Sequence, residues 1–323
     1  MTQKEENNIN TILANTEFHN QITPPADLNY VHQATADNTR KAYQSDIRHF
    51  IEWGGKLPTD TGTVVKYCET HATSLKPKTL QRRIIALRQF HHYQGFADPT
   101  AHPLVAKTLK GIANVHGMPA NQALPLLFDD LNKIILQLNT NSSLSAIRNA
   151  AMLSLGFFAA LRGSELTKVK VEDLSFEANG LVLLIPRSKT DQTGAGQTCA
   201  IPEQDNPLCP IRLIKKWLEI SELKRGYLFV SINRWQKLGS KSISIQSLNN
   251  IVRQCAKHAG LSTAENLSSH SLRRGFATSA SQVGASFKSI MAQGRWRHEG
   301  TVLEYIEAGQ QFNDNAVSKL FEK

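Results

Sequence analysis

Cysteine is scarce in this 323-residue chain, and its four copies lie far apart, at Cys68, Cys199, Cys209 and Cys255. No two of them form a C-x-x-C pair, so the sequence offers no ligand framework for zinc. Neither a metal nor another cofactor is expected. Cysteine usage of this kind predicts a reducing, cytoplasmic environment.

Long apolar runs are also missing. No stretch is long enough to cross a bilayer, which takes about 20 consecutive apolar residues. Residues 1–20 are polar and lack the apolar centre of a secretory signal. The sequence therefore predicts a protein without a membrane partner.

Positive charge, in contrast, is abundant, with a net charge of +10. Residues 1–33 carry one lysine and four acidic residues. Residues 34–115 carry twelve Lys and Arg against six acidic residues, and residues 116–323 carry 24 against 17. Both predicted folded parts are basic, which favours a polyanionic partner over a merely soluble basic protein.

Composition and periodicity divide the chain into five segments. The pattern predicts a flexible, Asn- and Thr-rich arm over residues 1–33 and a helical domain over 34–115. Gly and Pro mark a linker over 116–125. A second domain over 126–309 and an amphipathic segment over 310–323 follow. Phe312, Ala316, Val317, Leu320 and Phe321 give that last segment its apolar face.

The expected fold is mainly α-helical with a small antiparallel sheet or hairpin. In the first domain, helices are predicted from about residue 37, after a cap at Thr61, over 77–95 and over 100–114. In the second, an apolar run over 143–161 predicts a buried helix, and 180–186 with 198–201 predicts a β-hairpin. Residues 207–323 are predicted to be mostly helical.

Five side chains in three short motifs carry the chemistry. Arg162 lies in Ala-Leu-Arg-Gly-Ser-Glu-Leu, His270 and Arg273 lie in His-Ser-Leu-Arg, and Trp296 precedes Tyr305 by nine residues. The planar guanidinium group of arginine can donate two parallel hydrogen bonds to phosphate oxygens, and histidine can transfer a proton near neutral pH. A phenol can act as a covalent nucleophile. This set suits attack on a phosphodiester without a metal.

The order and spacing of these motifs resemble the tyrosine recombinases, also called the phage integrase family. The segment 290–296, Ile-Met-Ala-Gln-Gly-Arg-Trp, is most similar to the Cre-like branch of that family. Further upstream, the resemblance extends to a first helix with Thr39, Tyr43, Asp46, Ile47 and Phe50. It implies an N-terminal core-binding domain and a C-terminal mixed α/β catalytic domain.

The resemblance also implies roles for individual residues. Tyr305 would be the nucleophile that forms a 3′-phosphotyrosine, Arg162 and Arg273 would hold the phosphate, and His270 would transfer a proton. The family's hairpin lysine corresponds to Lys189, and Glu165 would orient its charged neighbours. Most of the family has histidine where this chain has Trp296, and an indole donates a hydrogen bond but cannot titrate. His298 lies only seven residues before Tyr305 and is the poorer match.

Partners follow from the same resemblance. It implies double-stranded DNA with inverted-repeat half-sites, a dimer on each site and a tetramer in the synapse. Basic side chains outside the motifs are expected to contact DNA, namely Lys78, Arg82, Arg83, Arg88 and Arg274. The 310–323 segment is expected either to pack on its own core or to dock on a neighbouring protomer.

Three other classes remain as alternatives. A type IB topoisomerase would use the same nucleophile and relax supercoils without strand exchange. A DNA-binding regulator would not need Arg162, Lys189 and Tyr305 together. A metal-dependent nuclease would need a carboxylate cluster that the sequence does not offer. A site-specific recombinase is the best-supported interpretation.

Overall fold

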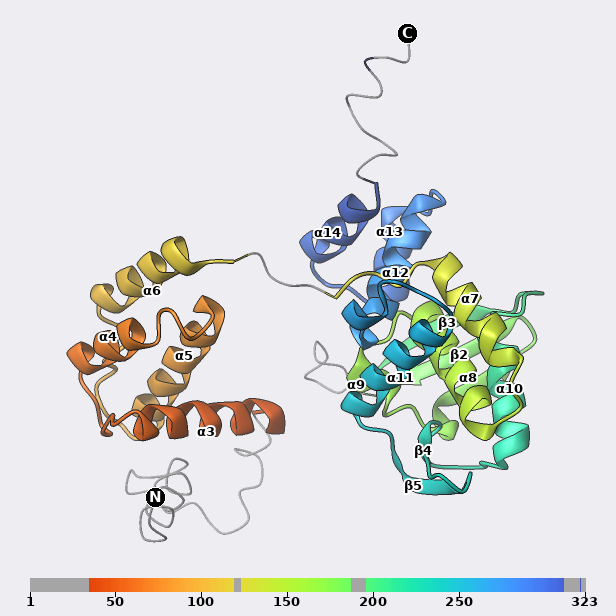
Figure 1. Ribbon diagram of the computed structural model, residues 1–323, viewed down its shortest axis with the longest axis horizontal. Helices are drawn as coiled ribbons and strands as arrows, with labels where there is room; N and C mark the ends of the chain where they lie inside the picture. Colours follow the sequence, from red (N-terminus) through yellow and green to blue (C-terminus); the bar gives the residue numbers. More distant parts are fainter. Residues whose placement is uncertain (1–34, 119–122, 187–195, 311–319, 321–323) are drawn as a thin grey trace. The chain divides into compact units, whose positions relative to one another are not determined.

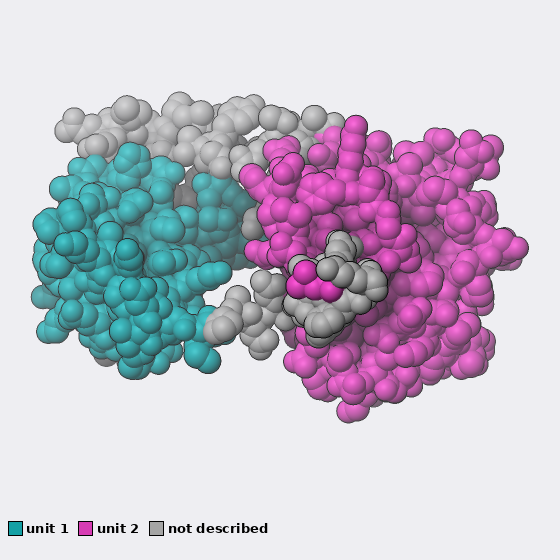
Figure 2. Space-filling model, turned by 90° about the horizontal axis from the view of Figure 1, so that it is seen from above, with its two compact units in different colours: residues 1–121 teal, residues 122–323 magenta. Residues whose placement is uncertain are grey.

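The computed structural model describes residues 35–118, 123–186, 196–310 and 320. The chain separates into two compact units, 1–121 and 122–323, coloured separately in Figure 2. The division falls inside the predicted linker. In the described residues, no helix is long and apolar enough to cross a membrane.

Four helices make up the described part of the first unit: α3 (Asp37–Glu52), α4 (Thr61–Thr70), α5 (Pro77–Tyr93) and α6 (Pro103–His116). Their apolar faces enclose one core that contains Phe50, Tyr67 and Leu87. Proline occupies the first turn of α5 and α6, where its missing N–H costs no hydrogen bond. The prediction of Thr61 as a cap was wrong. Asp60 caps α4 instead, because its Oδ1 accepts from Thr63 N at 3.0 Å.

The second unit is built around the buried helix α8 (Leu144–Phe158), as Figure 1 shows. Seven further helices are described there: α7 (Phe128–Asn139), α9 (Gly163–Leu166), α10 (Pro210–Ser221), α11 (Ile245–His258), α12 (Ser269–Gln282), α13 (Phe287–Gly294) and α14 (Glu299–Gln310). Helices α7, α10 and α12 all contact α8. The apolar core of this unit includes Met152, Phe157 and Trp217.

Two small antiparallel sheets complete the second unit. The first has the order β1 (Leu174–Glu177), β2 (Gly180–Ile185) and β3 (Gln197–Pro202), with Leu183 opposite Cys199. The predicted hairpin of β2 and β3 is confirmed. The second sheet pairs β4 (Val230–Ile232) with β5 (Leu238–Ser242), in a region that was predicted to be mostly helical and for which no strand was predicted.

Candidate active site

The turn that follows α8 places Arg162. The predicted helix over 143–161 is longer than the observed one, which ends at Phe158. Ala160 then adopts a left-handed conformation with φ 45°, and Leu161 N donates back to Gly156 O at 3.0 Å. This backbone pattern is a common helix ending, although glycine is its usual residue. Arg162 becomes the N-cap of the short helix α9.

Glu165 binds the arginine that precedes it. Its Oε1 accepts from Arg162 Nη1 at 2.7 Å, and its Oε2 accepts from Arg162 N at 2.9 Å. The Glu165 side chain is only 3% exposed. Burial raises the pKa of Glu165, but the hydrogen bonds from Arg162 and the charges of Arg162 and Arg295 outweigh that effect. The pKa therefore lies below its ordinary value, and the carboxylate stays charged.

Helix α12 carries the second motif. Ser268 caps it by accepting from His270 N at 3.2 Å. His270 is exposed, and Arg273, one turn further on, is buried. Arg273 Nη1 donates to Ala160 O at 2.5 Å, while its buried Nη2 has no hydrogen-bond partner. One donor of this guanidinium is thus fixed, and another has no hydrogen-bond partner within the protein.

Arg273 is held in a site that is short of negative charge. Burial, together with the charges of Arg162 and Arg295, lowers the pKa of Arg273 to about 9, while the charge of Glu165 acts in the opposite direction. Three arginines therefore share one buried carboxylate. An incoming phosphate would supply a second anion in a poorly hydrated environment, where charge pairing is strong.

Trp296 and Tyr305 pack beside Arg273. The Arg273 guanidinium lies 4.1 Å from the centre of the Trp296 ring, and the Trp296 and Tyr305 rings meet edge to face at 6.2 Å. Gly294 makes room for the indole, because a Cβ at that position would lie 1.6 Å from Trp296. Thr278 Oγ1 donates to Tyr305 O at 3.0 Å and fixes α14 on α12.

The structure therefore brings Arg162, Arg273, Trp296 and Tyr305 together within the second unit, and His270 lies one turn before Arg273 on α12. Lys189, the sixth predicted catalytic side chain, lies outside the described residues. His298 is exposed and lies just before α14. Arg295 was not predicted from the sequence. It is buried at the end of α13, and its Nη2 lies 3.5 Å from Glu165 Oε2. The residue type alone does not identify Arg295 as part of the site, because the placement of its side chain depends on a left-handed backbone conformation.

The predicted DNA-binding side chains have different surroundings. Lys78 is exposed, whereas Arg82 binds Asp46 through two hydrogen bonds of 2.8 and 2.7 Å. Arg83 is 12% exposed and contacts Asp46 and Tyr67. Arg88 lies near Asp98. In the second unit, Arg274 donates to Ala123 O and lies 5.0 Å from the Tyr305 ring centre.

The family is established by direct comparison. The model of the phage integrase family matches residues 125–311, and that of the phage integrase N-terminal SAM-like domain matches residues 28–94. The chain belongs to the phage integrase family. It is a site-specific tyrosine recombinase, an enzyme that breaks and rejoins DNA strands.

Individual relatives agree with this assignment. An integrase/recombinase xerD homolog from Selenomonas ruminantium is 36% identical, over 90% of this chain and 87% of its own length. Recombinase cre of Escherichia phage P1 is 26% identical, over 85% of each chain. The solved structure of the XerH site-specific recombinase, bound to a palindromic difH substrate, has a TM-score of 0.68 with 18% identity. That alignment covers 97% of this chain and 95% of the other. The expected two-domain fold is confirmed.

Proposed function

We propose that this recombinase cleaves DNA by attack of Tyr305 Oη on a phosphodiester. The Tyr305 Oη–P bond forms as the P–O5′ bond breaks, which leaves a 3′-phosphotyrosine and a free 5′-hydroxyl. The edge-to-face contact of Tyr305 with Trp296, itself stacked on buried Arg273, carries this proposal. These contacts place Tyr305, the nucleophile that the motifs predict, close to Arg273.

The arginines would stabilise the charge that develops on the phosphate. Arg273 has a buried Nη2 without a hydrogen-bond partner, and Arg162 is held by Glu165 with 19% of its side chain exposed. Donors fixed before the substrate arrives need no reorganisation during the reaction. Trp296 would donate its N–H to a phosphate oxygen, since an indole donates but does not accept.

Two proton transfers complete the cycle. His270, exposed on the first turn of α12, would accept the Tyr305 proton and return it on religation. Lys189 would protonate the leaving 5′-oxygen. The phosphotyrosine keeps the energy of the broken bond, so the 5′-hydroxyl of another strand can displace Tyr305 without ATP.

The direct test is to trap the covalent intermediate. A DNA duplex selected from a randomised pool by binding to the full-length protein is nicked near the cleaved position, so that the short 5′-hydroxyl product diffuses away. An SDS-stable adduct with the DNA 3′ end is expected, and it should form equally well in EDTA. A 5′-linked adduct, or loss of the adduct in EDTA, would contradict the mechanism.

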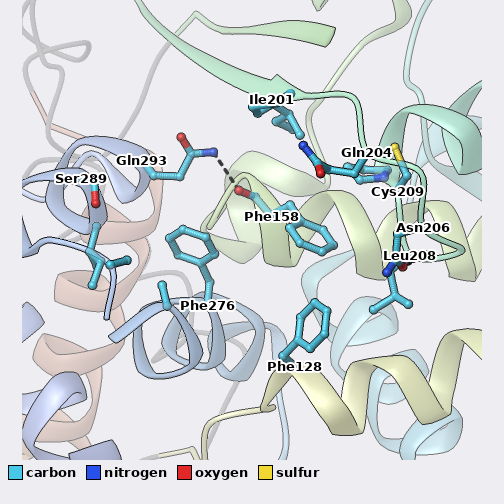
Figure 3. A pocket seen from close by; sticks show the side chains of 15 residues that line it. Phe128, Phe158, Ile201, Gln204, Asn206, Leu208, Cys209, Phe276, Ser289 and Gln293 are labelled. Atoms are coloured by element: carbon cyan, nitrogen blue, oxygen red, sulfur yellow. Dashed lines mark hydrogen bonds between the residues drawn. The ribbon is translucent and has the colours of Figure 1, made fainter. Parts of the chain in front are cut away.

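We also propose that two protomers bind inverted half-sites and that four form the synapse, with residues 310–323 docking on a neighbouring copy. An apolar pocket of about 470 Å³ in the second unit supports this idea, and Figure 3 shows its wall. Phe128, Phe158 and Phe276 line it, and so do Ile201 and Ile290. Most of the predicted docking segment, 311–319 and 321–323, lies outside the described residues. Leu320 is 72% exposed.

Deleting residues 310–323 should reduce cooperative binding to a two-half-site duplex and leave binding to one half-site unchanged. Gel-shift titrations measure both. Ala280→Glu would place a charge on the pocket lining and should have the same effect. Val283→Glu is the matched control, because Val283 is 83% exposed and does not line the pocket. Unchanged cooperativity in the deletion variant would rule out the docking role.

We also propose a cytoplasmic location. The four cysteines are buried free thiols, which is compatible with a reducing compartment.

Four of the predicted DNA-binding side chains remain proposed phosphate contacts, namely Lys78, Arg82, Arg88 and Arg274. For Arg83, the observed partners favour a role in holding α3, α4 and α5 together.

A further inference from the structure

Arg295 occupies a position where arginine is unfavourable on two counts. It is the C-cap of α13, with the left-handed angles φ 55° and ψ 40°, which side chains other than glycine rarely adopt. It is also 8% exposed, so its charge is largely removed from water. Strain of this kind persists where surrounding contacts offset it, and such positions cluster at functional sites.

The contacts of Arg295 lead to the turn that carries Arg162. Three consecutive carbonyls at the end of α8 each accept a hydrogen bond from a side chain far away in the sequence. Phe158 O accepts from Gln293 at 2.9 Å, Ala159 O from Arg295 at 3.0 Å, and Ala160 O from Arg273 at 2.5 Å. The last carbonyls of a helix lack helical partners and carry partial negative charge, so cationic donors suit them.

Glu165 extends this connection to the arginine itself. Its two oxygens bind the Arg162 guanidinium and backbone, and Oε2 also lies 3.5 Å from Arg295 Nη2. Arg295 is thus the second cation on the carboxylate that orients Arg162. Without Arg295, the Glu165 carboxylate would be paired with Arg162 alone.

The backbone of Arg295 also sets the position of the next residue. Trp296 N donates to Met291 O at 3.1 Å, and the indole folds back over Gly294. Arg273 stacks on that indole, and Tyr305 meets its edge. A single residue therefore contacts the Arg162 turn through its side chain and directs Trp296 through its main chain.

We propose that Arg295 is a positioning residue for strand cleavage, which acts by holding the Arg162–Glu165 turn and the Trp296 segment in one fixed arrangement. This inference rests on the proposed role of Tyr305 and Arg162 at the phosphate. Arg295 itself would not contact DNA at the reacting atoms. Its removal should slow the chemical step while leaving DNA affinity intact.

Arg295→Gly is the informative variant, because glycine accepts the left-handed backbone and removes only the side chain. At saturating protein, the rate of adduct formation on the selected nicked duplex should fall about tenfold or more, since small misplacements of reacting groups are costly. The dissociation constant for the same DNA should change by less than about twofold. Glu222→Gly is the matched control: Glu222 is also a left-handed helix C-cap, at φ 55°, and is exposed. That variant should cleave at the wild-type rate.

A second measurement separates positioning from loss of stability. In an Arg162→Lys background, Arg295→Gly should reduce the rate by less than about threefold, because residues that act through one another are not additive. The proposal would be overturned if the rate reductions caused by Arg162→Lys and Arg295→Gly multiply in full in the double variant. A wild-type rate for Arg295→Gly alone would also overturn it. An adduct that persists in Tyr305→Phe would instead overturn the proposed mechanism, so the two failures are distinguishable.

Discussion

Replacing Tyr305 with phenylalanine is expected to abolish the SDS-stable protein–DNA adduct completely. The change removes one oxygen and keeps the ring that packs against Trp296. Val302 and Ile290, the buried centre of that small cluster, are untouched. Because no other atom at this position can form the phosphotyrosine bond, the loss should reach the detection limit of the gel.

Binding provides the control for this variant. Tyr305→Phe should bind the selected duplex with an unchanged dissociation constant, because its surface charge and fold are preserved. Tyr227→Phe is a matched change at a tyrosine that packs against the main core of the same unit. It should leave adduct formation intact. An adduct of undiminished yield in Tyr305→Phe would exclude Tyr305 as the nucleophile.

Arg273→Ala is expected to have the second largest effect, a fall in the cleavage rate of about 100- to 1,000-fold. That range is typical for removing one preorganised donor to a developing oxyanion. The variant loses a guanidinium that donates a hydrogen bond to Ala160 O and stacks on Trp296, so the proposed phosphate contact and the contacts that hold it in place are lost together. Single-turnover cleavage at saturating protein measures the effect.

A buried arginine elsewhere in the unit tests whether this effect is specific. Arg148 is 6% exposed and donates to Val230 O at 3.0 Å, and burial lowers its pKa to about 10. Arg148→Met should lower the melting temperature, because a buried carbonyl loses its partner. It should not slow cleavage selectively at a temperature where the protein is folded. A comparable rate loss in both variants would show that Arg273 acts through stability alone.

The sequence predicted the helices and the first hairpin because their patterns are long or strongly apolar. Helix α5 begins at Pro77, the predicted position, and β2 is a nearly continuous apolar strand. The second hairpin was missed because β4 has only three residues and β5 reads Leu-Gly-Ser-Lys-Ser. Strands this short are defined by their pairing partner, which a local pattern does not contain.

The site was predictable to the extent that its chemistry lies in side-chain type and spacing. His270 and Arg273 are three residues apart and share a helix, so both could be placed together. Arg295 could not be found in this way. Its importance depends on a backbone angle, on burial and on Glu165, which lies 130 residues earlier in the chain. Long-range pairing of this kind leaves no mark in a local sequence window.

The three carbonyls at the end of α8 have a consequence for synthesis of the protein. The residues that carry these carbonyls, 158–160, leave the ribosome more than a hundred residues before the side chains that bind them, namely Arg273, Gln293 and Arg295. A nascent chain that stops short of these residues therefore has an open helix end beside Arg162. The proposed phosphate site is therefore complete only after Arg295 has been added to the chain, so a nascent chain that stops before Arg295 is expected not to cleave DNA.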